Sequence, residues 1–146
     1  MAAHERFRVF DTDQWYRGQQ KLGSRLAMVV RAGRWLAIRG QTGHDLDGTF
    51  HGRGDVACQT GQAMKNLRTL LAEAGGNLED VCKVRLWVRD RAFIEPASRV
   101  LGQHFRGIPI ILDTAVISAF ARPWLDMEID VWAVLQDRNA DVRTRP

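Results

Sequence analysis

The chain has 146 residues, of which 45% are hydrophobic and 26% are charged, and this composition is typical of one globular domain with an ordinary core. Its formal net charge of +4 raises the question of nucleic-acid binding. The basic residues are spread along the whole chain among 17 acidic residues, so a solvated surface of mixed charge explains them better than a nucleic-acid groove.

The sequence also argues against membrane, metal and disulfide classes. It has no apolar run near the roughly 20 residues that a spanning helix needs, and residues 1–10 lack the apolar centre of a signal peptide. We therefore expect a cytoplasmic protein with no membrane partner. Cys58 and Cys82 fall at core-like positions, which predicts buried, reduced thiols. The four histidines lack metal-ligand spacing, so we predict no metal site and no cofactor.

The N-terminal part of the chain predicts a short strand, one turn of helix and a hairpin. The strand spans residues 5–10, and residues 11–13 offer side-chain caps for the helical turn that follows. Two apolar segments, residues 26–30 and 35–38, flank a turn that contains Gly33. This pattern predicts a β-hairpin that joins the main sheet.

Residues 40–54 contain five glycines and few apolar side chains, which predicts a loop. Long loops in compact domains often carry function. His44 and Asp45 lie next to each other in this loop and would suit a catalytic pair. The alternative is an ordinary solvated histidine.

The central stretch, residues 54–90, predicts one long amphipathic helix followed by a strand. Asp55 suits the N-cap of the helix, and Gly75 with Gly76 suits its end. Apolar residues recur at helical spacing between these ends. They are Val56, Thr60, Ala63, Leu67, Leu70, Leu71 and Ala74. From residue 81 to residue 89 the period changes to two, which is typical of a strand with one buried face.

The C-terminal part predicts a second helix and two more strands. Asp90 suits the cap of the helix, and Pro96 falls within its first turns. The strands span residues 110–119 and 127–135, and a polar tail follows. The whole pattern predicts an α+β fold with a sheet of about six strands and two helices on one face.

The face of the sheet without helices carries opposite charges and indoles. One strand is expected to carry Lys83, Arg85, Trp87 and Arg89 on this face, and another to carry Glu128, Asp130 and Trp132. Such a surface suits a second copy of itself, which predicts a closed homo-oligomer. The alternative is a solvated face with paired charges.

A set of residues in fixed order resembles a known family. It comprises Gly33, Gly40, Gln41, Asp55, Gln59, Gln62, Asn66, Leu70, Leu71, Ala74, Gly75, Leu78, Glu79, Asp80, Val81, Lys83, Val88, Asp90, Glu128, Ile129 and Ala133. This order is similar to that of the Rid family, also described as YjgF-like or as L-PSP endoribonucleases. The resemblance implies a chorismate-mutase-like (Rid) fold over residues 1–135, a tail at 136–146, and a homotrimer with small-molecule clefts between subunits.

The resemblance also implies an activity. In the best-known branch of the family, the clefts hydrolyse reactive enamines and imines, such as 2-aminoacrylate, to a keto acid and ammonia. An arginine anchors the substrate carboxylate, and a glutamate positions or deprotonates the attacking water. Glu128 matches that glutamate and is the predicted catalytic residue. The alternative is an ordinary ion pair of Glu128 with Lys83 or Arg85.

The chain departs from this branch at the arginine. Asp113 stands where the arginine precedes Thr114, and a carboxylate there would repel a substrate carboxylate by about 1 to 4 kcal/mol at roughly 4 Å. The usual Ser-Gly-Gln motif is replaced by Arg39-Gly40-Gln41. Arg39 would then supply the missing positive charge. Asp113 would either pair with Arg39 or bind a cationic group of the substrate. The alternative is a structural ion pair of Arg39 with Asp113.

The predicted substrate-binding residues are therefore Arg39, Gln41, Asp113, Thr114 and Trp124. Three functions remain open. The first is hydrolysis of an imine or enamine metabolite. The second is a non-catalytic trimer that binds a small metabolite, for example as a regulator. The third is the endoribonuclease of the family's older name.

Overall fold

A computed structural model describes residues 3–138 of the chain. The strands are β1 (Glu5–Phe7), β2 (Phe10–Asp11), β3 (Arg25–Leu26), β4 (Val29–Ala32), β5 (Trp35–Gln41), β6 (Val81–Val88), β7 (Ile111–Val116) and β8 (Met127–Val134). The α-helices are α1 (Thr12–Trp15), α2 (Val56–Glu73) and α3 (Ile94–His104), and the 3-10 turns are η1 (Leu78–Asp80) and η2 (Arg91–Phe93).

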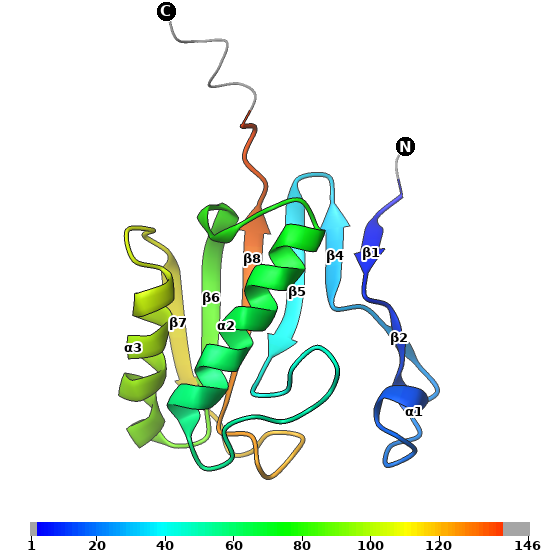
Figure 1. Ribbon diagram of the computed structural model, residues 1–146, viewed down its shortest axis with the longest axis vertical. Coiled ribbons are helices and arrows are strands. Elements are labelled where there is room, and N and C mark those ends of the chain that lie inside the picture. The colour runs from blue at the N-terminus through cyan, green and yellow to red at the C-terminus, as the bar shows by residue number, and fades with distance from the viewer. Residues whose placement is uncertain (1–2, 139–146) are drawn as a thin grey trace, which may run out of the picture.

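Six strands form one mixed sheet in the order β1-β4-β5-β8-β6-β7, and β2 pairs with β3 in a small separate ribbon. Helices α2 and α3 lie side by side on one face of the large sheet (Figure 1). All neighbours in the large sheet are antiparallel except β6 and β7. Parallel strands need a crossover, and α3 supplies it. The predicted α+β fold, with six strands and two helices on one face, is confirmed.

Helix α2 is built as its sequence predicts. The Asp55 carboxylate accepts a hydrogen bond from the Cys58 amide at 3.0 Å, and so caps the free N–H groups of the first turn. Gly75 ends the helix with a φ of 91°, which is a conformation that favours glycine. Between these ends, the apolar stripe is buried against the sheet.

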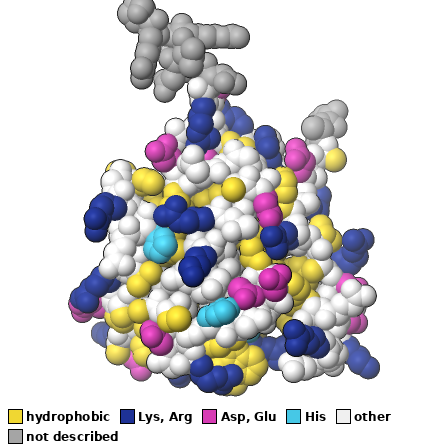
Figure 2. All heavy atoms as spheres, in the orientation of Figure 1, with side chains coloured by type: hydrophobic (Ala, Val, Ile, Leu, Met, Phe, Trp, Pro, Cys, Tyr) yellow, Lys and Arg dark blue, Asp and Glu magenta, His cyan; other side chains and the backbone are white. Residues whose placement is uncertain are grey.

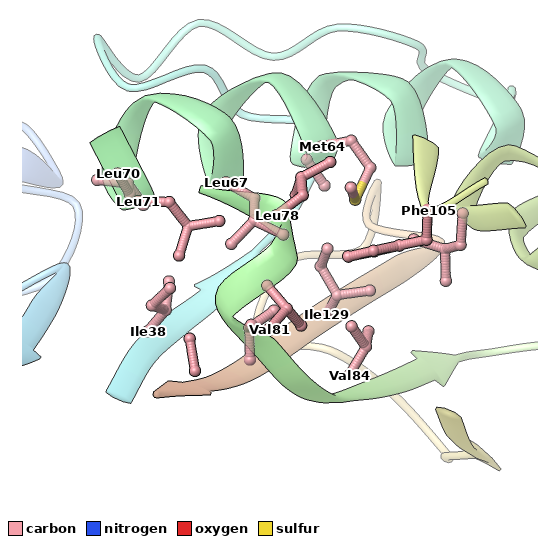
Figure 3. Close-up of a cluster of buried hydrophobic side chains, with 14 of the residues drawn as sticks. Ile38, Met64, Leu67, Leu70, Leu71, Leu78, Val81, Val84, Phe105 and Ile129 are labelled. Atoms are coloured by element: carbon pink, nitrogen blue, oxygen red, sulfur yellow. The ribbon is translucent and has the colours of Figure 1, made fainter. Parts of the chain in front are cut away.

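The core lies between α2 and the sheet. Figure 3 shows Leu67, Leu70 and Leu71 pointing from the helix toward the strands that carry Ile38 and Ile129. Phe105, at the end of α3, closes the same core. Truncating any one of these leucines to alanine should destabilise the fold by about 2 to 5 kcal/mol, because it leaves a cavity in close-packed surroundings.

The prediction of two buried cysteines is wrong, since both side chains are exposed. The pairing of β6 with β8 shifts register between Val81 and Lys83, so Val81 is buried and Cys82 turns outward. A bulge of this kind breaks the strict alternation on which the prediction rested. Cys58 is in the first turn of α2 and points away from the face that Val56 buries.

The face of the sheet without helices carries paired charges and exposed indoles. Arg85 Nε donates to Asp130 Oδ1 at 2.9 Å, and Trp87 Nε1 donates to Asp130 Oδ2 at 3.0 Å. The rings of Trp35 and Trp132 meet edge to face, with centroids 6.4 Å apart, and the two residues are 55% and 42% exposed. A single chain therefore leaves two indole rings partly exposed on this face, and the homo-oligomer stays a prediction.

The first residues beyond β8 are anchored to the domain. The Gln136 amide donates to Asp80 Oδ1 at 2.9 Å, and Arg138 Nη2 lies 2.9 Å from Asp80 Oδ2. The rest of the predicted tail, residues 139–146, lies outside the described residues. No helix within residues 3–138 is long and apolar enough to cross a membrane.

Candidate functional site

A cleft of about 320 Å³ opens at one end of the sheet. Its walls come from the segment after α1, the end of β5, the loop at residues 42–48, the turn at residues 121–125, and the start of β8. Four of the predicted site residues line it: Arg39, Gln41, Trp124 and Glu128. The cleft therefore gathers side chains that are almost 90 positions apart in the sequence.

Glu128 reaches the cleft because a β-bulge makes room for it. Between Ile38 and Gln41 the strand β5 has two residues, Arg39 and Gly40, opposite the single residue Asp130 of β8. The Glu128 carboxylate lies across Gly40, and a Cβ on Gly40 would fall on Oε1 and come within 2.5 Å of Cδ. Any residue other than glycine at position 40 would therefore displace the Glu128 carboxylate.

Burial raises the pKa of the half-buried Glu128 carboxyl above its ordinary value of 4.5. The nearby positive charge of Arg39 opposes this rise, and the negative charge of Asp130 adds to it. Among residues 3–138 no side-chain nitrogen of a basic residue lies within 4.0 Å of the Glu128 carboxylate. Lys83 pairs with Asp113 at 2.7 Å instead, and Arg85 pairs with Asp130. The alternative of an ion pair with Lys83 or Arg85 is thus wrong.

Arg39 is held by an aromatic side chain that the sequence did not reveal. Its Nη2 donates to the hydroxyl of Tyr16 at 3.1 Å, and its Cζ lies 5.3 Å from the ring centroid of Phe10. Phe10 is held in place by the β2-β3 ribbon, where it pairs with Leu26. The capped turn at Asp11, which orders α1, was the one signal that pointed toward Tyr16.

Arg122 is a second cation in the cleft, and the sequence analysis did not identify it. It lines the cleft, and its Cζ lies 5.4 Å from the ring centroid of Tyr16 and 6.0 Å from that of Trp124. Trp124 therefore lies in the cleft wall as predicted, and it also orients a guanidinium group.

Gln41 lines the cleft, but its side-chain amide is buried and occupied. Its Nε2 donates to the carbonyl of Arg39 at 2.9 Å, and its Oε1 accepts from Asn66 Nδ2 at 3.2 Å. Asn66 Nδ2 also donates to the carbonyl of His44 at 2.7 Å. Gln41 thus ties the bulge of β5 to α2 and to the loop, which suits a positioning role.

The proposed pair of His44 with Asp45 is wrong. Asp45 Oδ2 lies 2.8 Å from His51 Nε2, whereas His44 Nδ1 lies 3.2 Å from Thr42 Oγ1. Trp124 Nε1 donates to His44 Nε2 at 3.4 Å. Burial and the charge of Arg122 lower the pKa of His44, so its imidazole is neutral at pH 7.

Asp113 and Thr114 lie apart from this cleft within the chain. Both are on β7, and β6 separates that strand from β8. Asp113 is 60% exposed at its side chain and pairs with Lys83. The suggested ion pair of Arg39 with Asp113 is therefore not formed within one subunit. Residues 3–138 contain no group of three His, Cys, Asp or Glu side chains that could hold a metal ion.

The chain is similar in sequence to known proteins. Residues 21–135 match the family model described as Endoribonuclease L-PSP. The chain is 31% identical over 108 residues to Protein DfrA of Myxococcus xanthus, and this alignment covers 74% of this chain and 82% of that protein. It is 30% identical over 79 residues to a RutC family protein of Pyrococcus horikoshii, covering 54% of this chain and 63% of that protein.

Solved structures show the same fold. A Yersinia pestis member of the Rid protein family superposes with a TM-score of 0.76 at 20% identity, covering 91% of this chain and 100% of that one. A Mycobacterium tuberculosis member of the YjgF/YER057c/UK114 family superposes with a TM-score of 0.74 at 24% identity, with the same coverage.

Proposed function

We propose, given that this chain belongs to the endoribonuclease L-PSP family, also called the Rid or YjgF family, that its cleft hydrolyses a small imine or enamine. The observation that carries the proposal is the Glu128 carboxylate. It is half-buried, lies in the cleft with no cation within 4.0 Å among the described residues, and has a pKa raised by burial. These are the properties of a general base.

In the proposed reaction, Glu128 takes a proton from a water molecule, and the oxygen of that water attacks the carbon of the C=N bond. The nitrogen accepts a proton, and the resulting carbinolamine collapses to a carbonyl compound as ammonia leaves. One water is consumed for each imine, and no oxidant or reductant is needed. An enamine first tautomerises to the imine, gaining a proton at carbon and losing one from nitrogen.

Arg39 is the proposed anchor for a substrate carboxylate. Its guanidinium lies close enough for its charge to oppose the rise in the pKa of Glu128, yet it forms no ion pair among the described residues. It is thus free to pair with an incoming anion beside the base. Within its own subunit Asp113 lies two strands away from Glu128. Arg39 would offset the repulsion expected wherever Asp113 of a neighbouring subunit reaches the substrate.

The active assembly is proposed to be a homotrimer with the cleft completed by a neighbouring subunit. The support within one chain is the exposed pair Trp35 and Trp132, together with the paired charges around them on the helix-free face. Asp113 and Thr114 are proposed to reach a substrate only through such an assembly. Light scattering coupled to size-exclusion chromatography measures the mass directly.

The test of the hydrolase is the rate of loss of a 2-imino acid made in situ by an amino-acid oxidase, followed by trapping with semicarbazide. Glu128→Gln should lower the rate by about 10² to 10⁴-fold, because the amide cannot accept the proton. Glu95→Gln is the matched control, since Glu95 is exposed on α3 and pairs only with Arg99. Equal rates for wild type and Glu128→Gln would remove Glu128 from the mechanism.

The second candidate is a binding protein without turnover, and Asp113 in place of the usual arginine favours it. It predicts that a small acid raises the melting temperature while no imine is consumed. The endoribonuclease ranks third. Figure 2 shows basic side chains interleaved with acidic and hydrophobic ones on the face that carries the helices, with no continuous basic track on that face.

A further inference from the structure

Tyr16 places two guanidinium groups in the same cleft. Its hydroxyl accepts a hydrogen bond from Arg39, and its ring lies against Arg122. Arg39 comes from β5 and Arg122 from the turn before β8, and both line the cleft together with Tyr16. One phenol therefore organises two cations that are more than 80 positions apart in the sequence.

Neither arginine has an acidic partner. Within residues 3–138, no carboxylate oxygen lies within 4.0 Å of Arg39 or Arg122, whereas Arg8, Arg85 and Arg89 each have one. Both unpaired side chains are partly buried, and a desolvated cation without an anion is unfavourable. The aromatic contacts of Arg39 and Arg122 compensate for only part of this loss, because a ring face carries no full negative charge.

The acidic groups of the cleft leave both arginines free. Asp45 pairs with His51 and accepts from the amides of Asp47 and Thr49. Asp47 is exposed on the loop. Glu128 lies close enough to Arg39 for their charges to interact, and the proposed reaction uses it as the base.

We propose that the ligand of this cleft carries two anionic groups, one bound by Arg39 and the other by Arg122, and that it is a small dicarboxylate. In its reactive form, which rests on the proposed hydrolase, this ligand is the imine or enamine of a dicarboxylic 2-oxo acid. The carboxylate next to the C=N bond pairs with Arg39, because that arginine lies beside Glu128. The distal carboxylate pairs with Arg122.

The test compares two acids that differ only in the distal group. 2-Oxoglutarate and 2-oxopentanoate have the same five-carbon chain, and only the first has a second carboxylate. One charge-assisted hydrogen bond should change the affinity by about 10 to 150-fold. Calorimetric titration of the wild type should therefore show 2-oxoglutarate binding at least about tenfold more tightly.

Three variants separate the two anion sites. Arg122→Gln should weaken 2-oxoglutarate to the level of 2-oxopentanoate and leave the latter unchanged, and Arg122→Lys should restore part of the preference. Tyr16→Phe removes the acceptor for Arg39 but keeps the ring beside Arg122, so it should weaken both acids equally. Arg53→Gln is the control, because Arg53 also stacks on Trp124, at 5.3 Å, but does not line the cleft.

Equal affinity of the wild type for the two acids, binding of neither, or a preference that survives Arg122→Gln would each overturn the dicarboxylate proposal. Turnover is measured separately, with 2-iminoglutarate made by glutamate oxidase and 2-iminopentanoate made by an amino-acid oxidase. Hydrolysis of both imines at equal kcat/KM leaves the hydrolase standing and refutes the dicarboxylate. Tight binding of 2-oxoglutarate without any turnover does the reverse.

Discussion

Replacing Gly40 by alanine should disable the cleft without unfolding the protein. The new methyl group would fall on Glu128 Oε1 and lie 2.5 Å from Cδ and 2.9 Å from Cγ, so the carboxylate has to leave its position. The backbone itself is under no strain, since the φ of Gly40 is not positive. Alanine also restricts the unfolded chain, which stabilises the fold by about 0.4 to 1 kcal/mol.

These opposing terms nearly cancel in stability but not in activity. Moving Glu128 off its preferred rotamer costs about 0.5 to 1.5 kcal/mol, so the net change should stay within about 1 kcal/mol, or about 2 to 4 °C in melting temperature. Loss of a correctly placed general base lowers the rate by about 10² to 10⁴-fold. Gly40→Ala should therefore behave like Glu128→Gln in turnover while its melting temperature stays close to that of the wild type.

Gly102→Ala is the matched control, because Gly102 lies in α3 and a Cβ there would meet no atom within 4 Å. A readout independent of turnover is the pKa of Glu128 followed by carboxyl NMR shifts. Displacement toward solvent should return this pKa toward 4.5 in Gly40→Ala. A variant with unchanged turnover and an unchanged Glu128 pKa would refute the reasoning from the bulge.

Further predictions concern the pH dependence set by Glu128, the buried Asp126 and the exposed Trp132. The folded-state pKa of Glu128 is raised above 4.5, so the protonated carboxyl contributes its full stabilisation below about pH 4.5 and this is lost as the pH rises through the folded-state pKa. Glu128→Gln should therefore have a higher melting temperature than the wild type at pH 7 and the same melting temperature at pH 4. Turnover should rise with pH through the same folded pKa. The carboxylate of Asp126 is buried, accepts a hydrogen bond from Gln59 at 2.8 Å and also pairs with Arg89. Asp126→Ala should therefore lower the free energy of unfolding in urea by about 2 to 4 kcal/mol. A loss below about 1 kcal/mol would contradict this. Trp132→Ala should shift the protein toward monomer in light scattering if the helix-free face is the subunit interface, and an unchanged mass would remove Trp132 from it.

The sequence predicted the elements around residues 54–90 nearly to the residue. Asp55 caps α2 and Gly75 ends it, as expected. These signals are local, because a cap needs only an acceptor beside free N–H groups and an amphipathic stripe needs only the helical repeat. The second helix was less exact, since Asp90 caps the short turn η2 and α3 begins at Ile94.

The site was predicted in part. Glu128, Arg39, Gln41 and Trp124 do meet in one cleft. Arg39, Gln41 and Glu128 lie in or beside the ordered set of residues that resembles the family. The ion-pair alternatives for Glu128 were wrong, because register decides pairing across a sheet: Lys83 and Arg85 find Asp113 and Asp130 on the strands beside them. Strand order could not be read from the sequence with the precision that such pairings require.

What the sequence by itself determined is the set of elements and their buried faces, because the periods of 3.6 and 2 are written in neighbouring residues. Only the tertiary structure decided the bulge that opens Gly40 to Glu128, the outward turn of Cys82, and the meeting of Tyr16 with Arg39 and Arg122. The physical reason is the same in each case. These features depend on which atoms of distant segments share a space, and a repeat along the chain carries no information about that.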